Sequence, residues 1–206
     1  GGIGATSHGE AFGKNYELPN MSAYCETCAA IGNVYLNHRL FLLHGESKYY
    51  DVLERTLYNG LISGVSLDGG GFFYPNPLES IGQHQRQPWF GCACCPPNIA
   101  RILTSLGQYI YTPREDALYV NLYIGNQVEI PVGSDTLCLR IDGNYPWQEQ
   151  VALTITSPVP ITHTLALRLP DWCRDPSVML NGAPLTGTIH KGYLHLTRTW
   201  QEGDRL

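Results

Sequence analysis

The chain has 206 residues, of which 43% are hydrophobic and 15% are charged, a composition typical of a globular protein of one or two domains. A net charge of −5 with only 13 Lys and Arg residues argues against nucleic acid or an anionic membrane as its main partner. No apolar run approaches the roughly 18 residues that a membrane-spanning helix requires.

Both ends of the sequence indicate a piece of a longer protein. The chain begins at Gly1 without a methionine, and it stops at Leu206 where the pattern predicts entry into a strand. Residues 1–20 are rich in glycine and are predicted to form a loop. The seven cysteines are odd in number and unevenly clustered, which favours reduced thiols and a metal over a secreted disulfide framework. We therefore expect a cytoplasmic protein.

The first helix is predicted to begin at a cap formed by Asn20 or Ser22 and to end at Gly45. Apolar residues recur along it at helical spacing on a wide stripe, so it is expected to be buried on most sides. A second helix is predicted over residues 46–62, with Glu54 on its polar face. Its expected inward residues are Tyr49, Val52, Leu53, Thr56 and Leu57.

Residues 64–87 form a long connection without a helix or strand pattern. It contains three consecutive glycines at 69–71 and then the aromatic run Phe72–Tyr74. Connections of this length are usually functional or disordered, and the density of aromatic residues argues against disorder. Tyr74 is able to donate a hydrogen bond to a ligand, although ordinary packing explains a tyrosine there equally well.

Three cysteines fall within one short stretch, Trp89–Asn98. A disulfide between the adjacent Cys94 and Cys95 would strain the peptide that joins them, whereas two neighbouring thiolates suit a soft metal, with Zn²⁺ the default. The prolines at 96 and 97 favour a helix start directly after the cysteines. The third helix is predicted to run from there to about Tyr111.

A second pair of cysteines opens the first helix. Cys25 and Cys28, three residues apart, would share one helix face and could complete a Cys₄ zinc site with Cys94 and Cys95. Alternatively, Glu26 replaces Cys25, which requires an irregular first turn because residues 26 and 28 diverge by about 200° on a regular helix. A redox Cys-x-x-Cys lacks the βαβ surroundings expected for it. Spacing alone leaves the first two alternatives open.

The pattern changes at residues 112–116, after which apolar and polar residues alternate with the period of a strand. Further strands are predicted at 127–132, 136–142, 150–156, 163–169, 177–181 and 192–199. Asn181-Gly182 and Lys191-Gly192 are turn signals between them. Short strands at this spacing indicate an antiparallel sandwich, with the domain boundary near residue 115. Cys138 and Cys173 lie in this region, and we interpret them as buried thiols.

Several long motifs, in the same order, resemble glycoside hydrolase family 127, the β-L-arabinofuranosidases. They are Glu26-Thr-Cys28, Glu54-Arg-Thr-Leu-Tyr-Asn-Gly60, Phe73-Tyr-Pro-Asn-Pro-Leu-Glu79 and Cys92-Ala-Cys-Cys-Pro-Pro-Asn-Ile-Ala-Arg101. The similarity covers nearly the whole chain. It implies a multidomain α and β protein: residues 1–114 as the C-terminal part of an (α/α)₆ catalytic barrel and residues 115–206 as an antiparallel β-sandwich, truncated at its end.

The resemblance also implies a ligand set and catalytic roles. Zn²⁺ would be held by Glu26, Cys28, Cys94 and Cys95. Cys94 would double as the nucleophile and Glu10 would be the general acid/base. Tyr74 matches an active-site tyrosine of the family, and His8 is expected to bind substrate nearby. The resemblance implies that Cys25 lies near the zinc ligands but is not one of them.

The implied activity is zinc-dependent, retaining release of non-reducing-end β-L-arabinofuranose from an arabinofuranoside or a related plant-glycan oligosaccharide. No nucleic acid or membrane partner is expected, and a homodimer of the full-length parent is a further option. The alternative is a non-catalytic, zinc-stapled carbohydrate-binding module. With only three barrel helices, this chain is expected to be inactive alone, because large apolar faces would be exposed.

Overall fold

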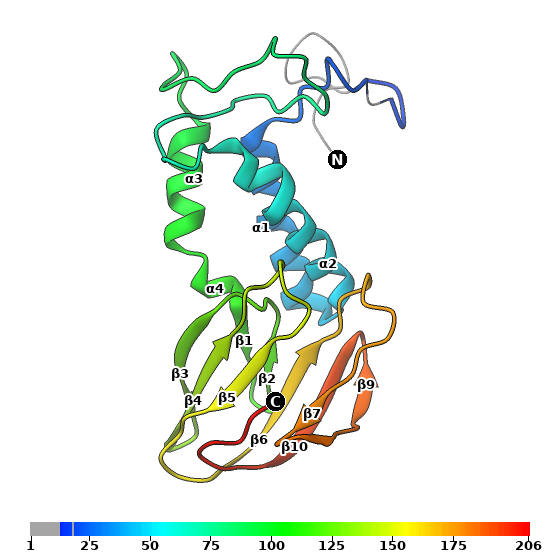
Figure 1. The fold of residues 1–206 in the computed structure, drawn as a ribbon, viewed down its shortest axis with the longest axis vertical. Coiled ribbons are helices and arrows are strands. Elements are labelled where there is room, and N and C mark those ends of the chain that lie inside the picture. The colour runs from blue at the N-terminus through cyan, green and yellow to red at the C-terminus, as the bar shows by residue number, and fades with distance from the viewer. Residues whose placement is uncertain (1–12, 18) are drawn as a thin grey trace. The chain divides into compact units, whose positions relative to one another are not determined.

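The computed structural model describes residues 13–17 and 19–206. The chain divides into two compact units, each of which is described by itself (Figure 1). Unit 1 contains the chain up to His44 together with Tyr49–Leu106, and it carries the long helices. Unit 2 contains Gly45–Lys48 and Gly107–Leu206, and it carries the sheets. Within the described residues, every helix is too short or too polar to cross a membrane.

Unit 1 is built around one long helix, α1. Its helical elements are α1 (Thr27–His44), α2 (Ser47–Thr56, of which the first two residues are assigned to unit 2), a π-helical turn (Leu57–Leu61), a 3₁₀ turn (Ile62–Gly64) and α3 (Cys95–Thr104). The π-helical turn and α3 both pack against α1. This packing brings the N-terminal ends of α1 and α3 together.

The first helix begins at Thr27, so the predicted cap at residue 20 or 22 is wrong. The residues directly before the helix are drawn into tertiary pairing instead. Glu26 forms an isolated β-bridge with Pro75, and the backbone N–H of Asn76 is 3.1 Å from the carbonyl oxygens of both residues before Glu26. Because this pairing satisfies the backbone of the segment, the local capping signals are overridden.

The buried face of the second helix matches the prediction only in part, since Leu53 and Leu57 are buried as expected. Tyr50 is buried where Tyr49 was expected, and Val52, predicted to face inward, is 41% exposed. Glu54, predicted to lie on the polar face, is only 5% exposed. The buried side chains at 50, 53, 57 and 61 recur every three or four residues. Tyr50 meets Phe41 of α1 edge to face with 4.8 Å between the ring centres, so contact with α1, and not hydrophobicity alone, sets the face that packs.

The connection between the 3₁₀ turn and α3 has no helix, as predicted, but its backbone is paired. Phe72 forms β-bridges with both Val65 and Gln87. Arg86 donates from Nη2 to the Ser63 carbonyl oxygen at 2.8 Å, and its guanidinium lies 4.3 Å from the centre of the Phe73 ring. These contacts tie the middle of the connection to the end of the preceding helical turns.

The single helix predicted after the cysteine stretch is two helices. α3 ends at Thr104 and a short helix, α4 (Gly107–Ile110), follows. Ser105 marks the end of α3, because its φ of −102° and ψ of 4° leave the helical range. Its hydroxyl donates back to the Arg101 carbonyl oxygen at 2.9 Å, and a side-chain bond of this kind competes with continuation of the helix.

Unit 2 contains a five-stranded sheet and two smaller sheets. The first has the order β1 (Tyr111–Pro113), β2 (Ala117–Val120), β6 (Ile161–Arg168), β10 (Tyr193–Trp200), β9 (Thr188–His190). The second has the order β3 (Asn126–Val132), β4 (Asp135–Asp142), β5 (Ala152–Ile155), and the third pairs β7 (Met179–Leu180) with β8 (Ala183–Pro184). Both two-residue turns predicted from Asn-Gly and Lys-Gly are present, with positive φ at residues 181, 182, 191 and 192.

The prediction of purely antiparallel pairing is wrong at one place. β2 and β6 run parallel, with Leu118 opposite Leu165 and Val120 opposite Leu167. Parallel neighbours cannot be joined by a hairpin, and the chain between them forms the β3–β5 sheet before it returns. Buried side chains alternate with exposed ones along β4, where Leu137, Leu139 and Ile141 face the core.

Candidate metal centre

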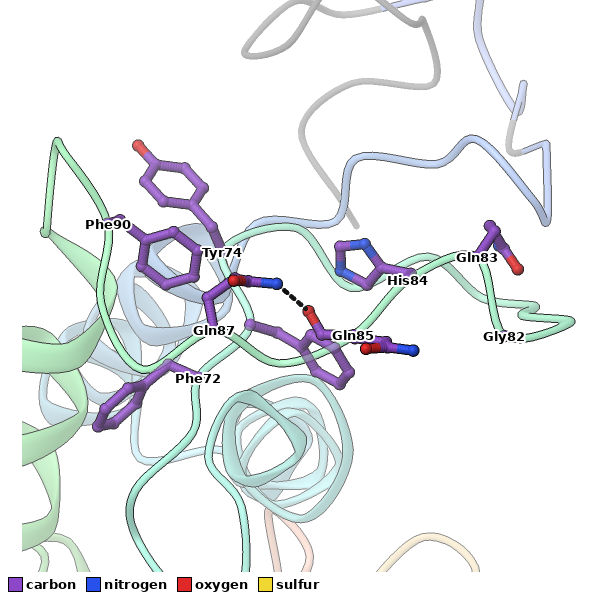
Figure 2. Close-up of a pocket in the computed structure, with 9 residues that line it drawn as sticks. Phe72, Tyr74, Gly82, Gln83, His84, Gln85, Gln87 and Phe90 are labelled. Atoms are coloured by element: carbon purple, nitrogen blue, oxygen red, sulfur yellow. Dashed lines mark hydrogen bonds between the residues drawn. The ribbon is translucent and has the colours of Figure 1, made fainter.

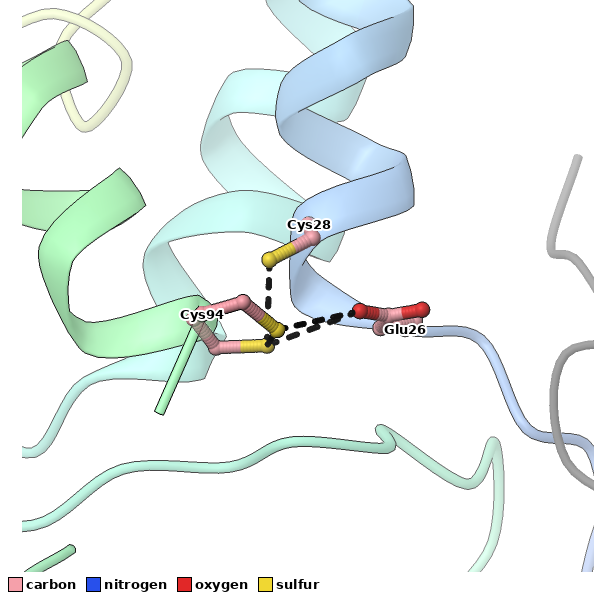
Figure 3. Close-up of side chains that lie close together, drawn as sticks. Glu26, Cys28 and Cys94 are labelled. Carbon is pink, nitrogen blue, oxygen red and sulfur yellow. Dashed lines mark hydrogen bonds between the residues drawn. The ribbon is translucent and has the colours of Figure 1, made fainter. Parts of the chain in front are cut away.

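Four potential ligands meet where the N-terminal ends of α1 and α3 lie side by side (Figure 3). Glu26 is the residue before α1 and Cys28 lies in its first turn. Cys94 is the N-cap of α3 and Cys95 is its first residue. One ligand atom from each of the four lies within 4.8 Å of all the others. The fold thus joins two segments that are 67 residues apart, counted from Cys28 to Cys95.

The spacing of these atoms fits one tetrahedral ion. The sulfurs of Cys28 and Cys95 are 3.3 Å apart, and those of Cys94 and Cys95 are 3.8 Å apart. Glu26 Oε1 is 3.6 Å from Cys94 Sγ and 3.9 Å from Cys95 Sγ. Ordinary Zn–S and Zn–O bond lengths at a tetrahedral centre place two sulfurs about 3.8 Å apart and a sulfur and an oxygen about 3.5 Å apart. The group can therefore hold a metal ion of this size.

Glu26 reaches the cluster because it precedes the helix. Its backbone is held in the bridge to Pro75 and lies outside the helix. The regular rotation of about 100° per residue, which would point its side chain away from Cys28, therefore does not apply to it. This is the irregular first turn that a Glu-Cys₃ set requires. Cys25 adopts a left-handed φ of 36° and, among the described residues, is not part of the four-ligand group. The Cys₄ alternative is thus not the set that the fold brings together.

Burial makes the deprotonated, charged form of the cluster unfavourable unless a cation is bound. Cys95 is completely buried and Glu26 is only 6% exposed. Burial raises the pKa of the Cys28 thiol to about 11, and it raises the pKa of Cys95 as well. Alone, these thiols would stay protonated at neutral pH beside a buried carboxyl group. A divalent cation with an affinity for sulfur offsets the cost of deprotonating the buried thiols, because it takes the place of their protons.

Asn98 is a residue of the site that the sequence reasoning missed. Its side-chain amide donates to Cys28 Sγ at 3.0 Å, and this bond opposes the effect of burial on the Cys28 pKa. Asn98 follows Cys94 by four residues, and its backbone N–H donates to the Cys94 carbonyl oxygen at 3.1 Å. The sequence did contain a signal for Asn98: it follows Cys94 by four residues, and residues four apart share a helix face.

Tyr74, predicted as a site residue, lies at the edge of the cluster. Its hydroxyl hydrogen-bonds Cys94, and this bond, followed by burial, raises the pKa of Tyr74. The phenol therefore keeps its proton and donates to sulfur at neutral pH. The backbone fixes its position, because the Thr27 N–H donates to the Tyr74 carbonyl oxygen at 2.9 Å. The ring also meets Phe90 edge to face, with 5.6 Å between the ring centres.

Among the described residues, the remaining candidates are not part of the cluster. Glu10 and His8 lie outside the described residues. Cys92 is exposed, although it is two residues from Cys94. Cys138 and Cys173, interpreted as buried thiols, are only half-buried and belong to unit 2.

Two family models match the chain. The model described as "Beta-L-arabinofuranosidase, GH127 catalytic domain" matches residues 1–108, and the one described as "Beta-L-arabinofuranosidase, GH127 middle domain" matches residues 117–206. A curated relative, a non-reducing end β-L-arabinofuranosidase of Bifidobacterium longum subsp. longum, is 37% identical over 213 residues. The match covers 95% of this chain and 32% of the relative, so the chain spans about a third of that protein's length.

Solved structures agree in fold over the whole chain. A GH127 β-arabinofuranosidase superposes with a TM-score of 0.92 at 52% identity, over 99% of this chain and 35% of its own. A GH127 β-L-arabinofuranosidase from Geobacillus stearothermophilus T6 gives a TM-score of 0.91 at 43% identity, over 100% of this chain and 34% of its own. The fold, including the paired helix ends that carry the cluster, is therefore shared with these proteins.

Proposed function

This chain belongs to glycoside hydrolase family 127, and on that basis we propose that it carries the reactive part of a zinc-dependent, retaining enzyme that releases non-reducing-end β-L-arabinofuranose. The observation that supports the proposal is the Glu-Cys₃ cluster, in which the three sulfurs differ in burial and in hydrogen bonding. Cys95 is completely buried, and Cys28 accepts a hydrogen bond from Asn98. Cys94 is half-buried and hydrogen-bonded to Tyr74, at the edge of the cluster.

Glu26, Cys28, Cys94 and Cys95 would hold the Zn²⁺ ion, which supplies one thing: it keeps the coordinating thiols deprotonated at neutral pH. Retaining glycosidases normally use one carboxylate as nucleophile and a second as acid/base. Here the Cys94 sulfur takes the place of the first. It attacks the anomeric carbon, forming a C–S bond as the glycosidic C–O bond breaks, and the Glu10 carboxylic acid gives its proton to the leaving oxygen.

The second half of the reaction reverses these roles. The Glu10 carboxylate removes a proton from water, the water oxygen bonds to the anomeric carbon, and the C–S bond breaks to return the Cys94 thiolate. Two displacements at one carbon leave its configuration unchanged. The Tyr74 hydroxyl, which keeps its proton, stabilises the departing thiolate by donating to it.

We also propose that unit 1 is the C-terminal part of an (α/α)₆ barrel and that unit 2 is a β-sandwich domain. The support for the barrel is apolar surface on the helices of unit 1. Leu36 and Leu43 on α1 are 56% and 76% exposed, and Leu103 on α3 is 40% exposed. Such side chains suit helices that pack against further barrel helices. By the same reasoning, the chain expressed alone should hydrolyse no measurable arabinofuranoside, and detectable turnover by it would contradict this assignment.

The deciding experiment is covalent trapping on the full-length protein. An arabinofuranosyl electrophile should add one sugar mass to the peptide that contains Cys94, seen by mass spectrometry after digestion. Cys94→Ser should lose the label, and the matched control Cys92→Ser, which removes an exposed thiol two residues away, should keep it. A label on Cys92 or Cys25, or no label in a zinc-loaded protein, would refute Cys94 as nucleophile.

A zinc-stapled carbohydrate-binding module is the second candidate, favoured by aromatic rings on unit 2. Trp172 is 57% exposed and stacks with Tyr145, their ring centres 6.2 Å apart and their planes 25° apart, and Trp147 is 83% exposed. Exposed rings of this kind suit sugar stacking. This candidate predicts zinc and glycan binding without a Cys94 adduct, so the trapping experiment separates the two functions.

A further inference from the structure

A pocket of about 310 Å³ opens in the connection between α2 and α3, next to Tyr74 (Figure 2). Its size lies at the lower end of the roughly 300–1,000 Å³ typical of small-ligand sites. Aromatic side chains form part of its lining, among them Phe72, Tyr74 and Phe90, and polar side chains form the rest, among them His84, Gln85 and Gln87. Among the described residues, none of those that line it is Asp, Glu, Lys or Arg. The lining therefore suits a neutral ligand with both hydroxyl groups and an apolar face.

The pocket is held open by the backbone and by stacking. Phe72 and Gln87 exchange backbone hydrogen bonds of 2.8 and 2.9 Å, so the two sides of the pocket are joined as in a short sheet. The His84 ring stacks on Phe73 with 4.8 Å between the ring centres and 20° between the planes. Its Nε2 lies 2.8 Å from the Pro75 carbonyl oxygen. These contacts fix the side chains before any ligand binds, which lowers the entropic cost of binding.

Polar groups remain available in this lining. A carbonyl oxygen only accepts, so His84 Nε2 carries the hydrogen toward Pro75, and Nδ1 of the neutral ring is left as an acceptor. Gln83 is already engaged, since its Oε1 accepts from the Ser80 hydroxyl and from a backbone N–H. The side chain of Gln85 is exposed, and Gln87 donates only a long 3.4 Å bond to the Gln85 carbonyl oxygen. Two amides thus offer both donors and acceptors to ligand hydroxyls.

Tyr74 connects the pocket to the proposed reaction, because it lines the pocket and hydrogen-bonds Cys94. The sugar under attack must touch the Cys94 sulfur, and neither Cys94 nor any other cluster residue lines the pocket. We propose that the pocket is the leaving-group subsite, which binds the sugar ring directly beyond the bond that is cleaved. This inference rests on the proposed function and adds the residues that select the leaving group.

The test compares two substrates of the full-length, zinc-loaded protein: a disaccharide of two L-arabinofuranose units and methyl β-L-arabinofuranoside, whose leaving group is too small to fill the pocket. Removing one hydrogen bond between neutral groups costs about 1 kcal/mol, which corresponds to about fivefold in kcat/KM. Gln85→Ala and Gln87→Ala should each lower the ratio of kcat/KM for the disaccharide to that for the methyl glycoside by about fivefold. Gln108→Ala, an exposed glutamine on α4, is the matched control and should keep the wild-type ratio.

The outcomes separate the two proposals. An unchanged ratio in both pocket variants, with the disaccharide still hydrolysed, would overturn the leaving-group subsite and leave the proposed function standing. Equal losses for both substrates would also overturn it, because they would place the glutamines in support of Cys94 and not of the leaving group. Failure of the wild-type protein to hydrolyse either substrate would instead overturn the proposed function, and with it the inference built on it.

Discussion

The side-chain amide of Asn98 donates a hydrogen bond to the sulfur of Cys28 at 3.0 Å, and so links the first turn of α3 to the first turn of α1. The amide faces a sulfur that would bind metal as an anion. Such a bond both orients the sulfur and stabilises its negative charge. Asn98 is not one of the four residues of the ligand group, so any effect that it has on metal affinity acts through Cys28.

Asn98→Ala should therefore weaken zinc binding without removing the site. Loss of a partner of this kind typically costs 10–100-fold in metal affinity, and we expect a decrease of about that size. The measurement is competition with a chromophoric chelator on the full-length protein. Asn59→Ala, an exposed asparagine in the π-helical turn, is the control. Equal zinc affinity in both variants would contradict the role of Asn98.

The ligand set predicts opposite effects for two neighbouring cysteines. Cys28→Ser should lose most bound zinc, because a hydroxyl is a poor replacement for a thiolate. Cys25→Ser should keep about one zinc per chain, since Cys25 lies outside the group of four. Metal analysis of the purified proteins decides this. Zinc loss in Cys25→Ser would restore the Cys₄ alternative.

Glu10→Gln should separate catalysis from metal binding. A glutamine cannot donate or accept the proton that the leaving oxygen and the attacking water require, so turnover should fall by at least about 10²-fold. The zinc content should stay at the wild-type level, because Glu10 is not among the proposed ligands. Loss of zinc together with activity would show that Glu10 has a different role.

Two glycine substitutions in unit 1 should change stability in opposite directions. A Cβ at Gly64 would lie 2.6 Å from Thr27 Cγ2 and 3.3 Å from Ile99 Cδ1, so Gly64→Ala should destabilise the protein by about 1–3 kcal/mol. Gly32 is exposed on α1, and the methyl group of an alanine there would meet nothing within 4 Å, so Gly32→Ala should stabilise by up to about 1 kcal/mol. Denaturant midpoints test both, and a neutral Gly64→Ala would show that α1 and α3 can move apart there.

His38 should make stability depend on pH. Burial, and then the charge of Arg39, lowers the pKa of His38 below its ordinary value, while its Nδ1 lies 3.0 Å from the Tyr50 hydroxyl. The unfolded chain therefore binds this proton more tightly, so stability is full above about pH 6.5 and is lost as the pH falls from there toward the lowered folded pKa. His38→Gln should reduce the slope of unfolding free energy between about pH 7 and 5. Parallel curves for both proteins across that range would contradict this.

Local patterns in the sequence predicted the elements whose structure depends on local chemistry. Six strands, β3 to β7 and β10, lie within a few residues of their expected positions, because alternation and Asn-Gly or Lys-Gly turns act over short distances, whereas the short strands β8 and β9 were not predicted. The start of α1 was missed because Pro75 and Asn76, about fifty residues away, pair with the segment before it. The buried Glu54 was missed because the packing of the neighbouring helices sets which side of α2 is covered.

In the candidate site, too, local sequence predicts some features, whereas others depend on contacts between distant residues. Adjacent cysteines followed by prolines were enough to predict a helix start after Cys94, which the fold has, and a place for both cysteines in a group that could hold a metal. Spacing could not choose between Cys25 and Glu26, since the answer depends on the bridge that holds residue 26 out of the helix. Family resemblance, not spacing, selected Glu26, and the cluster in the fold contains it.

The two halves of the cluster are 67 residues apart in the sequence, from Cys28 to Cys95, and this separation has a consequence for folding. An ion that joins them acts as a cross-link, and closing a loop of that length removes chain entropy from the unfolded state worth about 4 kcal/mol in the same way as a disulfide. Without it, α1 and α3 must find each other by diffusion and stay together by packing alone. Metal supply during synthesis would then govern the yield of folded protein as well as its chemistry.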